Sequence, residues 1–232
     1  MIRRALVAGA CFVVTASFCG SATITWQPIE DATGDASELI TTGNFVDSAT
    51  TYGGNDITVR GVTFNRRTSG GSSFGFANNS NITFSNVSTA YQDRFGSPPG
   101  SGWDTDYTEL LKGGCFTKTG TITIEIGGLT QGNPYRVQLW TAWRNEAWPT
   151  EFKDLSNNSS GNLVNGTSGS SPPECVVGTF TADSSTQTII ADRGSTYTVF
   201  TALQVRTPEP ACGTLIVFGV AIFGLGTGRR AT

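Results

Sequence analysis

The sequence predicts an all-β fold, an antiparallel β-sandwich of the jelly-roll type, from three observations. Short segments of alternating apolar and polar residues recur at intervals of about 8 to 12 residues, separated by Gly, Asn and Asp clusters. Charged residues make up only 14% of the chain and glycines number 29, as is typical of β-rich extracellular modules. A helical pattern occurs in one short segment. The jelly-roll is the expected form because it is the common double sheet of about eight strands.

The predicted strands run along most of the chain. Residues 121–126 (TITIEI) alternate most cleanly, with Ile122, Ile124 and Ile126 on one face. Residues 135–143 (YRVQLWTAW) have the strongest strand pattern, and we expect one of their two faces to lie in the core. The other predicted strands are residues 23–26, 45–46, 57–64, 81–87, 176–180, 186–191 and 197–205.

Residues 104–112 (DTDYTELLK) predict the one helix. Acidic residues occupy its first turn, Lys112 lies in its last turn, and Gly113 follows as a stop signal. Two Gly-, Ser- and Asn-rich stretches, residues 70–79 and 153–174, are expected to be surface loops.

The N-terminal segment, residues 1–22, is predicted to be a signal peptide. Two arginines precede an apolar stretch, residues 5–18, and small residues at 20–22 suit signal peptidase, so we place cleavage after Ala22. Cys19 leaves lipid modification as an alternative, which Phe18 disfavours because a small residue is required at its position. The folded domain is then residues 23–207, a length that suits a single sandwich.

The C-terminal segment, residues 208–232, has the pattern of a membrane anchor. Pro208, Glu209 and Pro210 precede an apolar run at residues 211–226, and Arg229 and Arg230 lie near the end. Because positive charge stays on the cytoplasmic side, we predict a C-terminal transmembrane helix at residues 211–228 with the domain outside. The apolar run of 16 residues is shorter than the roughly 20 that a bilayer requires, which indicates a transient anchor. A buried core helix or strand is the alternative.

In this order, the Pro-Glu-Pro triplet, the apolar run and the arginine pair resemble the PEP-CTERM sorting tail of bacterial exported proteins. The resemblance implies cleavage at the triplet by an exosortase-type membrane enzyme. It also implies a transient hold in the inner membrane, followed by display at the cell surface or in an exopolysaccharide matrix.

Several motifs of the domain carry a second resemblance. They are residues 61–64 (GVTF), 107–111 (YTELL), 128–140 (GLTQGNPYRVQLW), 177–183 (VGTFTAD) and 202–206 (ALQVR). Together they resemble a largely uncharacterised module of exported planctomycete and verrucomicrobial proteins. The resemblance covers nearly all of residues 26–206 and implies a galactose-binding-like jelly-roll.

Charge and composition narrow the function classes. Four of the 15 basic residues lie in the two terminal segments, so 11 remain in residues 23–210 against 18 acidic residues. Nucleic acid is therefore not an expected partner. Histidine is absent, which removes Ser-His-Asp and Cys-His catalysis and the commonest transition-metal ligand.

Cys115 and Cys175 are the two cysteines of the predicted domain, and we expect a disulfide between them because an exported protein meets an oxidising compartment. The loop that this bond would close contributes about 4 kcal/mol in the chain-entropy model. Two buried thiols are the alternative.

Aromatic residues near the strongest strand are the candidate ligand site, because sugar rings stack on flat apolar faces and need a few directed hydrogen bonds. Packing of Trp140 or Trp143 in the core is the alternative interpretation, and Trp148 is the tryptophan most expected to be exposed. The candidate ligand-binding residues are Trp148, Arg144, Trp140, Asn145, Glu146 and Trp103.

Acidic residues in a turn-rich segment are a second candidate site. Glu30, Asp31 and Asp35, with Glu38 nearby, could hold calcium, although their spacing does not match an EF-hand and solvated carboxylates are the alternative. No other cofactor is expected. We find no catalytic constellation and predict a non-enzymatic, carbohydrate-binding protein. The alternatives are a structural envelope or matrix protein without a specific ligand and, third, a polysaccharide hydrolase or lyase.

Overall fold

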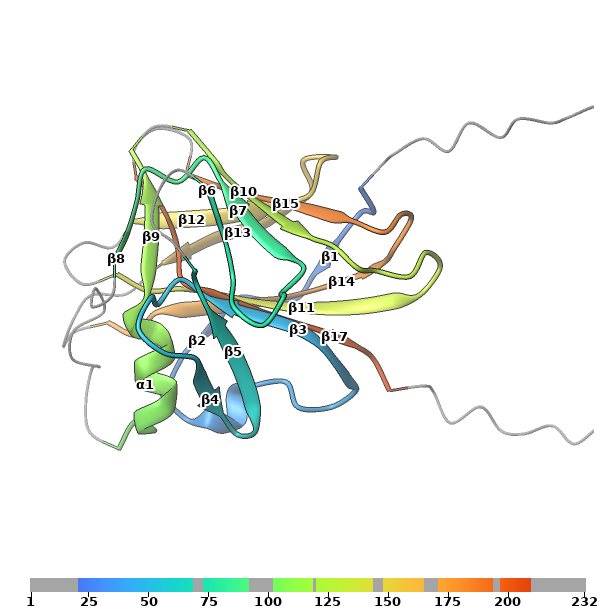
Figure 1. Ribbon diagram of the computed structural model, residues 1–232. Helices are drawn as coiled ribbons and strands as arrows, with labels where there is room; N and C mark the ends of the chain where they lie inside the picture. The colour runs from blue at the N-terminus through green and yellow to red at the C-terminus, as the bar shows by residue number, and fades with distance from the viewer. Residues whose placement is uncertain are drawn as a thin grey trace, which may run out of the picture.

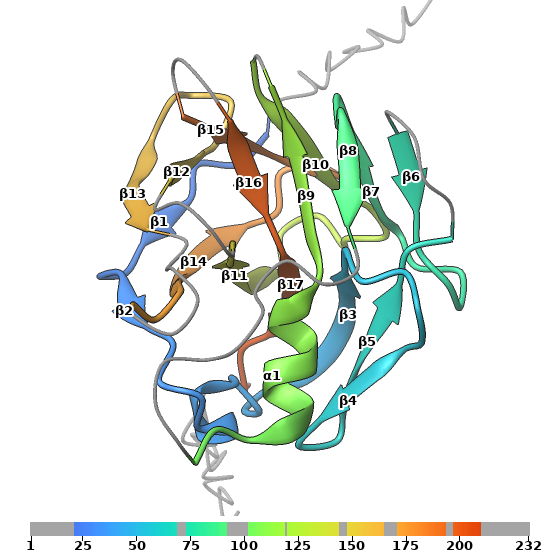
Figure 2. The same cartoon turned by 90° about the vertical axis from the view of Figure 1, so that its left-hand side faces the viewer.

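The computed structural model describes residues 21–68, 73–91, 102–118, 120–143, 148–164, 171–193 and 197–209. Two large β-sheets face each other in a sandwich, and a smaller sheet lies at one end (Figure 1). Figure 2 shows the three strands of the small sheet side by side above α1 (Thr105–Lys112). The predicted β-sandwich is therefore confirmed.

The first large sheet has eight strands, and its order brings the start and the end of the domain together. All of its pairs are antiparallel except the parallel pair β3–β5. The strands in order are β1 (Thr25–Trp26), β14 (Glu174–Thr181), β11 (Pro134–Thr141), β17 (Ala202–Thr207), β3 (Asn44–Thr50), β5 (Val62–Arg66) and β4 (Ile57–Val59), with β2 (Glu30–Asp31) also paired to β14.

The second large sheet has six strands and the small sheet has three, all paired antiparallel. The six strands in order are β13 (Ser159–Val164), β12 (Pro149–Lys153), β15 (Gln187–Asp192), β10 (Ile122–Ile126), β7 (Ile82–Ser85) and β6 (Ser73–Gly75). The three are β16 (Thr198–Phe200), β9 (Gly114–Thr117) and β8 (Thr89–Tyr91).

The main core lies between the two large sheets and follows the predicted alternation. Ile122, Ile124 and Ile126 of β10 are buried, while Glu125 between them is exposed. They share one apolar cluster with residues of β11 such as Leu139. Period-two alternation in a half-buried strand therefore located this core from sequence.

A second apolar cluster covers the other face of the eight-stranded sheet. Helix α1 lies on the side of this sheet that faces away from the six-stranded one (Figure 1), and it shares the cluster with the β4–β5 hairpin at the end of the sheet. Trp140 of β11 is fully buried in this cluster, against Tyr107 of α1 and Phe64 of β5. We expected one face of residues 135–143 to lie in the core, and both faces are buried because the sheet is covered on both sides here.

The predicted helix is confirmed together with its capping. The Asp104 side chain accepts a hydrogen bond from the Tyr107 amide at 2.8 Å, as expected of an N-cap residue. The helix ends before Gly113, where a Cβ atom would lie 2.4 Å from the Tyr52 amide nitrogen. Only glycine permits this approach of the two backbone segments.

Three predicted segments differ from the structure. Residues 57–64 form the hairpin β4–β5 instead of one strand, because Arg60 and Gly61 turn the chain with positive φ angles of 47° and 77°. The predicted loop at residues 70–79 contains β6, and the loop at residues 153–174 contains β13. Both strands pair with neighbours in the six-stranded sheet, a contact that local composition does not reveal.

The terminal segments are described only where they join the domain. Among the described residues, no helix has the length and apolar character needed to cross a membrane. The predicted membrane segment at 211–228 and residues 1–20 of the predicted signal peptide lie outside the described residues.

Candidate functional site

The tryptophan expected to be exposed, Trp148, packs inside an aromatic cluster. Its ring stacks on Tyr197 with centroids 4.3 Å apart and lies 5.5 Å from the ring of Trp143. Trp143 is buried and packs edge to face on Phe116, and the Arg193 guanidinium lies 5.7 Å from the Trp148 ring centre. Trp148 is thus half-buried, and protein groups occupy the surroundings of its ring.

Two further predicted ligand residues serve packing. Trp140 is fully buried and its Nε1 donates a hydrogen bond to the Tyr107 hydroxyl at 3.0 Å, so its assignment to a ligand site is wrong. Trp103 is half-buried against the second apolar cluster, where a Cβ atom at Gly34 would lie 2.1 Å from its Cδ2.

The predicted ligand residues do not form one site among the residues that the structure describes. Trp148 belongs to the aromatic cluster, whereas Trp140 and Trp103 belong to the cluster under α1. The other three candidates, Arg144, Asn145 and Glu146, lie outside the described residues.

The acidic candidates stabilise local structure. Glu30 and Asp31 form strand β2, and Asp35 caps a 3₁₀ turn, η1 (Ala36–Glu38), by accepting from the Ser37 amide at 2.7 Å. This backbone hydrogen bond lowers the pKa of Asp35. Glu38 accepts from the Tyr107 hydroxyl at 2.9 Å. In the described part of the chain, no group of three or more acidic or cysteine side chains is arranged to hold a metal ion.

The predicted disulfide between Cys115 and Cys175 is wrong in this structure, where both are free and buried. Cys115 lies in the core between the large sheets, and Cys175 lies in the cluster on the opposite side of the eight-stranded sheet. Burial raises the pKa of both thiols, to about 12 for Cys175. Sequence could not reveal this, because the side of a sheet that each residue faces depends on strand pairing.

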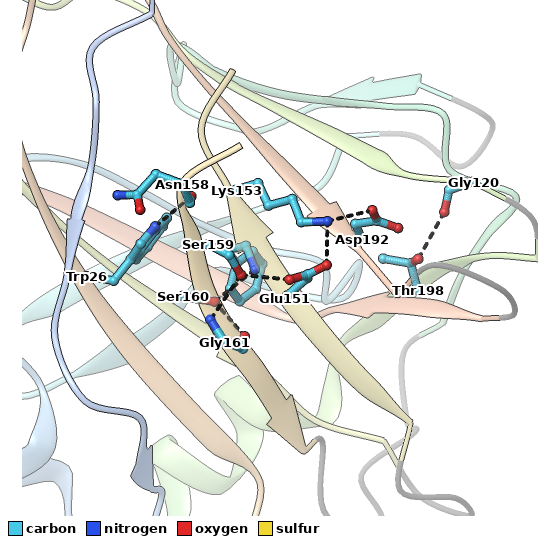
Figure 3. Close-up of polar contacts among 11 residues, drawn as sticks. Trp26, Gly120, Glu151, Lys153, Asn158, Ser159, Ser160, Gly161, Asp192 and Thr198 are labelled. Carbon is cyan, nitrogen blue, oxygen red and sulfur yellow. Dashed lines mark hydrogen bonds and ion pairs between the residues drawn. The ribbon is translucent and has the colours of Figure 1, made fainter. Parts of the chain in front are cut away.

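A polar cluster on the six-stranded sheet was not found from sequence (Figure 3). The Lys153 amine lies between the carboxylates of Glu151 and Asp192 and contacts both, the latter at 3.1 Å. The Ser159 hydroxyl donates to Glu151 at 2.7 Å. Hydrogen bonding to Glu151 raises the pKa of Lys153, so this lysine stays charged and cannot take the proton of a serine.

One groove is lined by residues of β1, β11 and β14 and by Pro208. The ends of β11 and β14 that supply these residues lie at the opposite end of the sheet from α1 (Figure 1). The cavity volume of the groove is about 490 Å³. Arg136 is the one charged side chain among the described residues that line it. Four threonines supply hydroxyl groups to its walls: Thr23, Thr25, Thr179 and Thr181.

Strand register places the polar side chains of this groove in one row. Thr25 of β1 pairs with Thr179 of β14, and Thr179 pairs with Arg136 of β11. Directly opposed residues of antiparallel strands point to the same face of a sheet. Tyr135 lies in the inter-sheet core, so by alternation this row faces outward.

Arg136 makes few polar contacts within the described part of the protein. Its Nη1 donates to the Thr42 hydroxyl at 3.4 Å, and its Nε is buried without a hydrogen-bond partner. The neighbouring Arg206 donates to the carbonyls of Thr41 and Gly43 at 3.0 and 2.8 Å. No ion pair in the described part of the chain involves either arginine. The groove therefore combines threonine hydroxyl groups with an arginine that forms no ion pair in the described part of the chain.

The predicted sorting motif starts at this groove. Strand β17 ends at Thr207, and Pro208, the next residue, lines the groove. Glu209 is the last described residue, and Pro210, Arg229 and Arg230 lie outside the described residues.

Comparison with known proteins gives no relative: no protein-family model, no curated protein and no solved structure matches the chain.

Proposed function

We propose that this chain is an exported, non-catalytic protein of the cell surface or exopolysaccharide matrix that binds carbohydrate in the Arg136 groove. Its proposed route uses a signal peptide, a transient hold in the inner membrane and processing by an exosortase-type enzyme at Pro208, Glu209 and Pro210. The PEP-CTERM resemblance supports this route. Nucleic acid is not a proposed partner.

We further propose that the sandwich is a galactose-binding-like jelly-roll. Eight strands support this assignment: β3, β17, β11 and β14 are neighbours in one sheet, and β10, β15, β12 and β13 in the other. Two sheets of four antiparallel strands with these crossovers have the double Greek-key order of a jelly-roll.

The observation that carries the binding proposal is the composition of the groove walls. Threonine hydroxyls both donate and accept hydrogen bonds, and a guanidinium donates several, which matches the many hydroxyl groups of a sugar. Tyr135 and Phe180 also border the groove and stack with ring centres 5.7 Å apart, but both rings are buried in the main core, so the polar row is the surface offered to a sugar. Carboxylates are absent from the described lining, so the paired acids of a glycosidase are not supplied there.

Two experiments test this proposal. Expression in a host with an exosortase should give a released protein whose mass places its C-terminus near residues 208–210, and retention of residues 229–230 would contradict the route. Immobilised extracellular polysaccharides, neutral and acidic, should retain the full chain. Failure to bind any of them would leave the second candidate, a structural matrix protein, which the packing of the described tryptophans favours.

A further inference from the structure

We infer that the Arg136 groove selects an acidic polysaccharide, with Arg136 as the contact for a sugar carboxylate. This inference rests on the proposed glycan binding and adds the chemical class of the ligand. It starts from an unusual pair: Arg136 of β11 and Arg206 of β17 are directly opposed across the strands. Like charges in directly opposed positions destabilise a sheet. Neither arginine forms an ion pair with a described carboxylate, and an external anion bound in the groove would offset their repulsion.

The two arginines differ in the hydrogen-bond donors that remain available to a ligand. Arg206 is buried, its Nη1 donates to the carbonyls of Thr41 and Gly43, and its Nε donates to the Gln204 side chain. Its charge remains and adds to the positive potential of the groove. Arg136 makes a single long hydrogen bond to Thr42 and keeps donors for a ligand. The forked geometry of a guanidinium suits a carboxylate, which accepts two parallel hydrogen bonds.

The rest of the groove fits an acidic sugar better than a bare anion. Thr25 and Thr179 extend the row from Arg136 toward the sheet edge, so hydroxyl groups of a pyranose ring can bond beside its carboxylate. The whole chain has a formal net charge of −3, so an anion is attracted to this groove locally and not by the protein as a whole.

The test compares binding of the full chain to polygalacturonate and to its fully methyl-esterified form. We expect the acidic polymer to bind at least about tenfold more tightly, because a hydrogen bond to a charged group contributes about that factor in affinity. Arg136→Gln should abolish this preference. Arg60→Gln removes the same charge from an exposed turn and should retain it.

A second variant keeps the test independent of the stability of Arg136→Gln. Thr179→Asp places a carboxylate beside Arg136 and should bind polygalacturonate about tenfold or more weakly than Thr179→Asn, which removes the same hydroxyl and adds a side chain of the same size without charge. Equal binding of both polymers, unchanged by Arg136→Gln, would overturn the inference and leave glycan binding intact. Binding of neither polymer nor of any neutral polysaccharide would overturn both.

Independently, we infer that signal cleavage falls before Ser21 and not after Ala22. Gln187 is almost fully buried, and its Nε2 donates to the Ser21 hydroxyl at 2.6 Å and to the Ala22 carbonyl at 3.0 Å. Ala22 itself is buried in the main core and lines the groove. Removal of both residues would leave the buried Gln187 amide short of two acceptors. In the sequence, Ser17 and Cys19 supply small residues for a cut that leaves Gly20 first.

N-terminal sequencing of the exported protein tests this inference. We expect the first residue to be Gly20 or Ser21. A mature chain that starts at Thr23 would overturn the cleavage inference while supporting export, and a chain that keeps Met1 would overturn both.

Discussion

The outer face of the eight-stranded sheet has two halves with opposite character, although strands β11 and β14 run through both. Toward α1, the outward residues are Trp140 of β11, Cys175 of β14 and Ala202 of β17, all buried under the second apolar cluster. Toward the other end, the outward row contains Arg136 and Thr179 and lines the groove. One half thus completes the core, and the other is the surface on which we propose that carbohydrate binds.

A buried polar row separates the two halves. Gln204 donates to Gln138 at 2.7 Å across β17 and β11, and Gln138 donates to the Glu38 carbonyl at 3.0 Å. The Ile40 amide donates to the Gln138 oxygen, so both ends of this buried amide are satisfied. The second apolar cluster therefore ends at this row, and the hydrogen bonds of Gln138 offset the cost of burying its amide.

The covered half should contribute the largest single effect on stability. Trp140→Ala removes a fully buried indole and leaves a cavity, so we expect a loss of about 3 to 5 kcal/mol in the free energy of unfolding. Urea unfolding followed by circular dichroism measures this. A loss below about 1 kcal/mol would show that the cluster under α1 is not tightly packed.

Tyr107→Phe should have the next largest effect. The Tyr107 hydroxyl accepts from Trp140 Nε1 and donates to Glu38, so its loss leaves a buried indole N–H unpaired. We expect a loss of about 1 to 3 kcal/mol by urea unfolding, with no change in polysaccharide binding. Reduced binding would contradict the separation of the two halves.

Trp148→Ala distinguishes the aromatic cluster from a ligand platform. Because Trp148 stacks on Tyr197 and is half-buried, we expect a loss of about 1 to 2 kcal/mol in stability and unchanged glycan affinity. Thermal unfolding and binding to immobilised polysaccharide, measured on the same preparation, check both. Weaker polysaccharide binding with unchanged stability would show instead that Trp148 belongs to the ligand site.

Arg136→Gln should have the smallest effect on stability. The substitution removes the repulsion between Arg136 and the opposed Arg206. We therefore expect the free energy of unfolding to stay within about 0.5 kcal/mol of the wild-type value. Urea unfolding at low ionic strength measures this. A loss of several kcal/mol would assign Arg136 to the core and not to the groove.

Local patterns predicted single elements well and contacts between elements poorly. The alternation at residues 121–126 and the capping signals at 104–112 located β10 and α1 closely, because both depend on neighbours along the chain. The burial of Trp140, the separation of Cys115 from Cys175 and the groove depend on strand order. The pattern at residues 135–143 placed Arg136 in a strong strand, but no local signal pairs it with Arg206 and Thr179.

The most direct test of this account maps where an acidic glycan touches the full chain. Amide hydrogen exchange is measured with and without a galacturonate oligomer. We predict slower exchange at residues 134–137 and 178–181, around Arg136 and Thr179, and no change around Trp140 or Trp148. Protection confined to the Trp148 cluster, or none at all, would contradict the claim that the open half of the sheet is the binding surface.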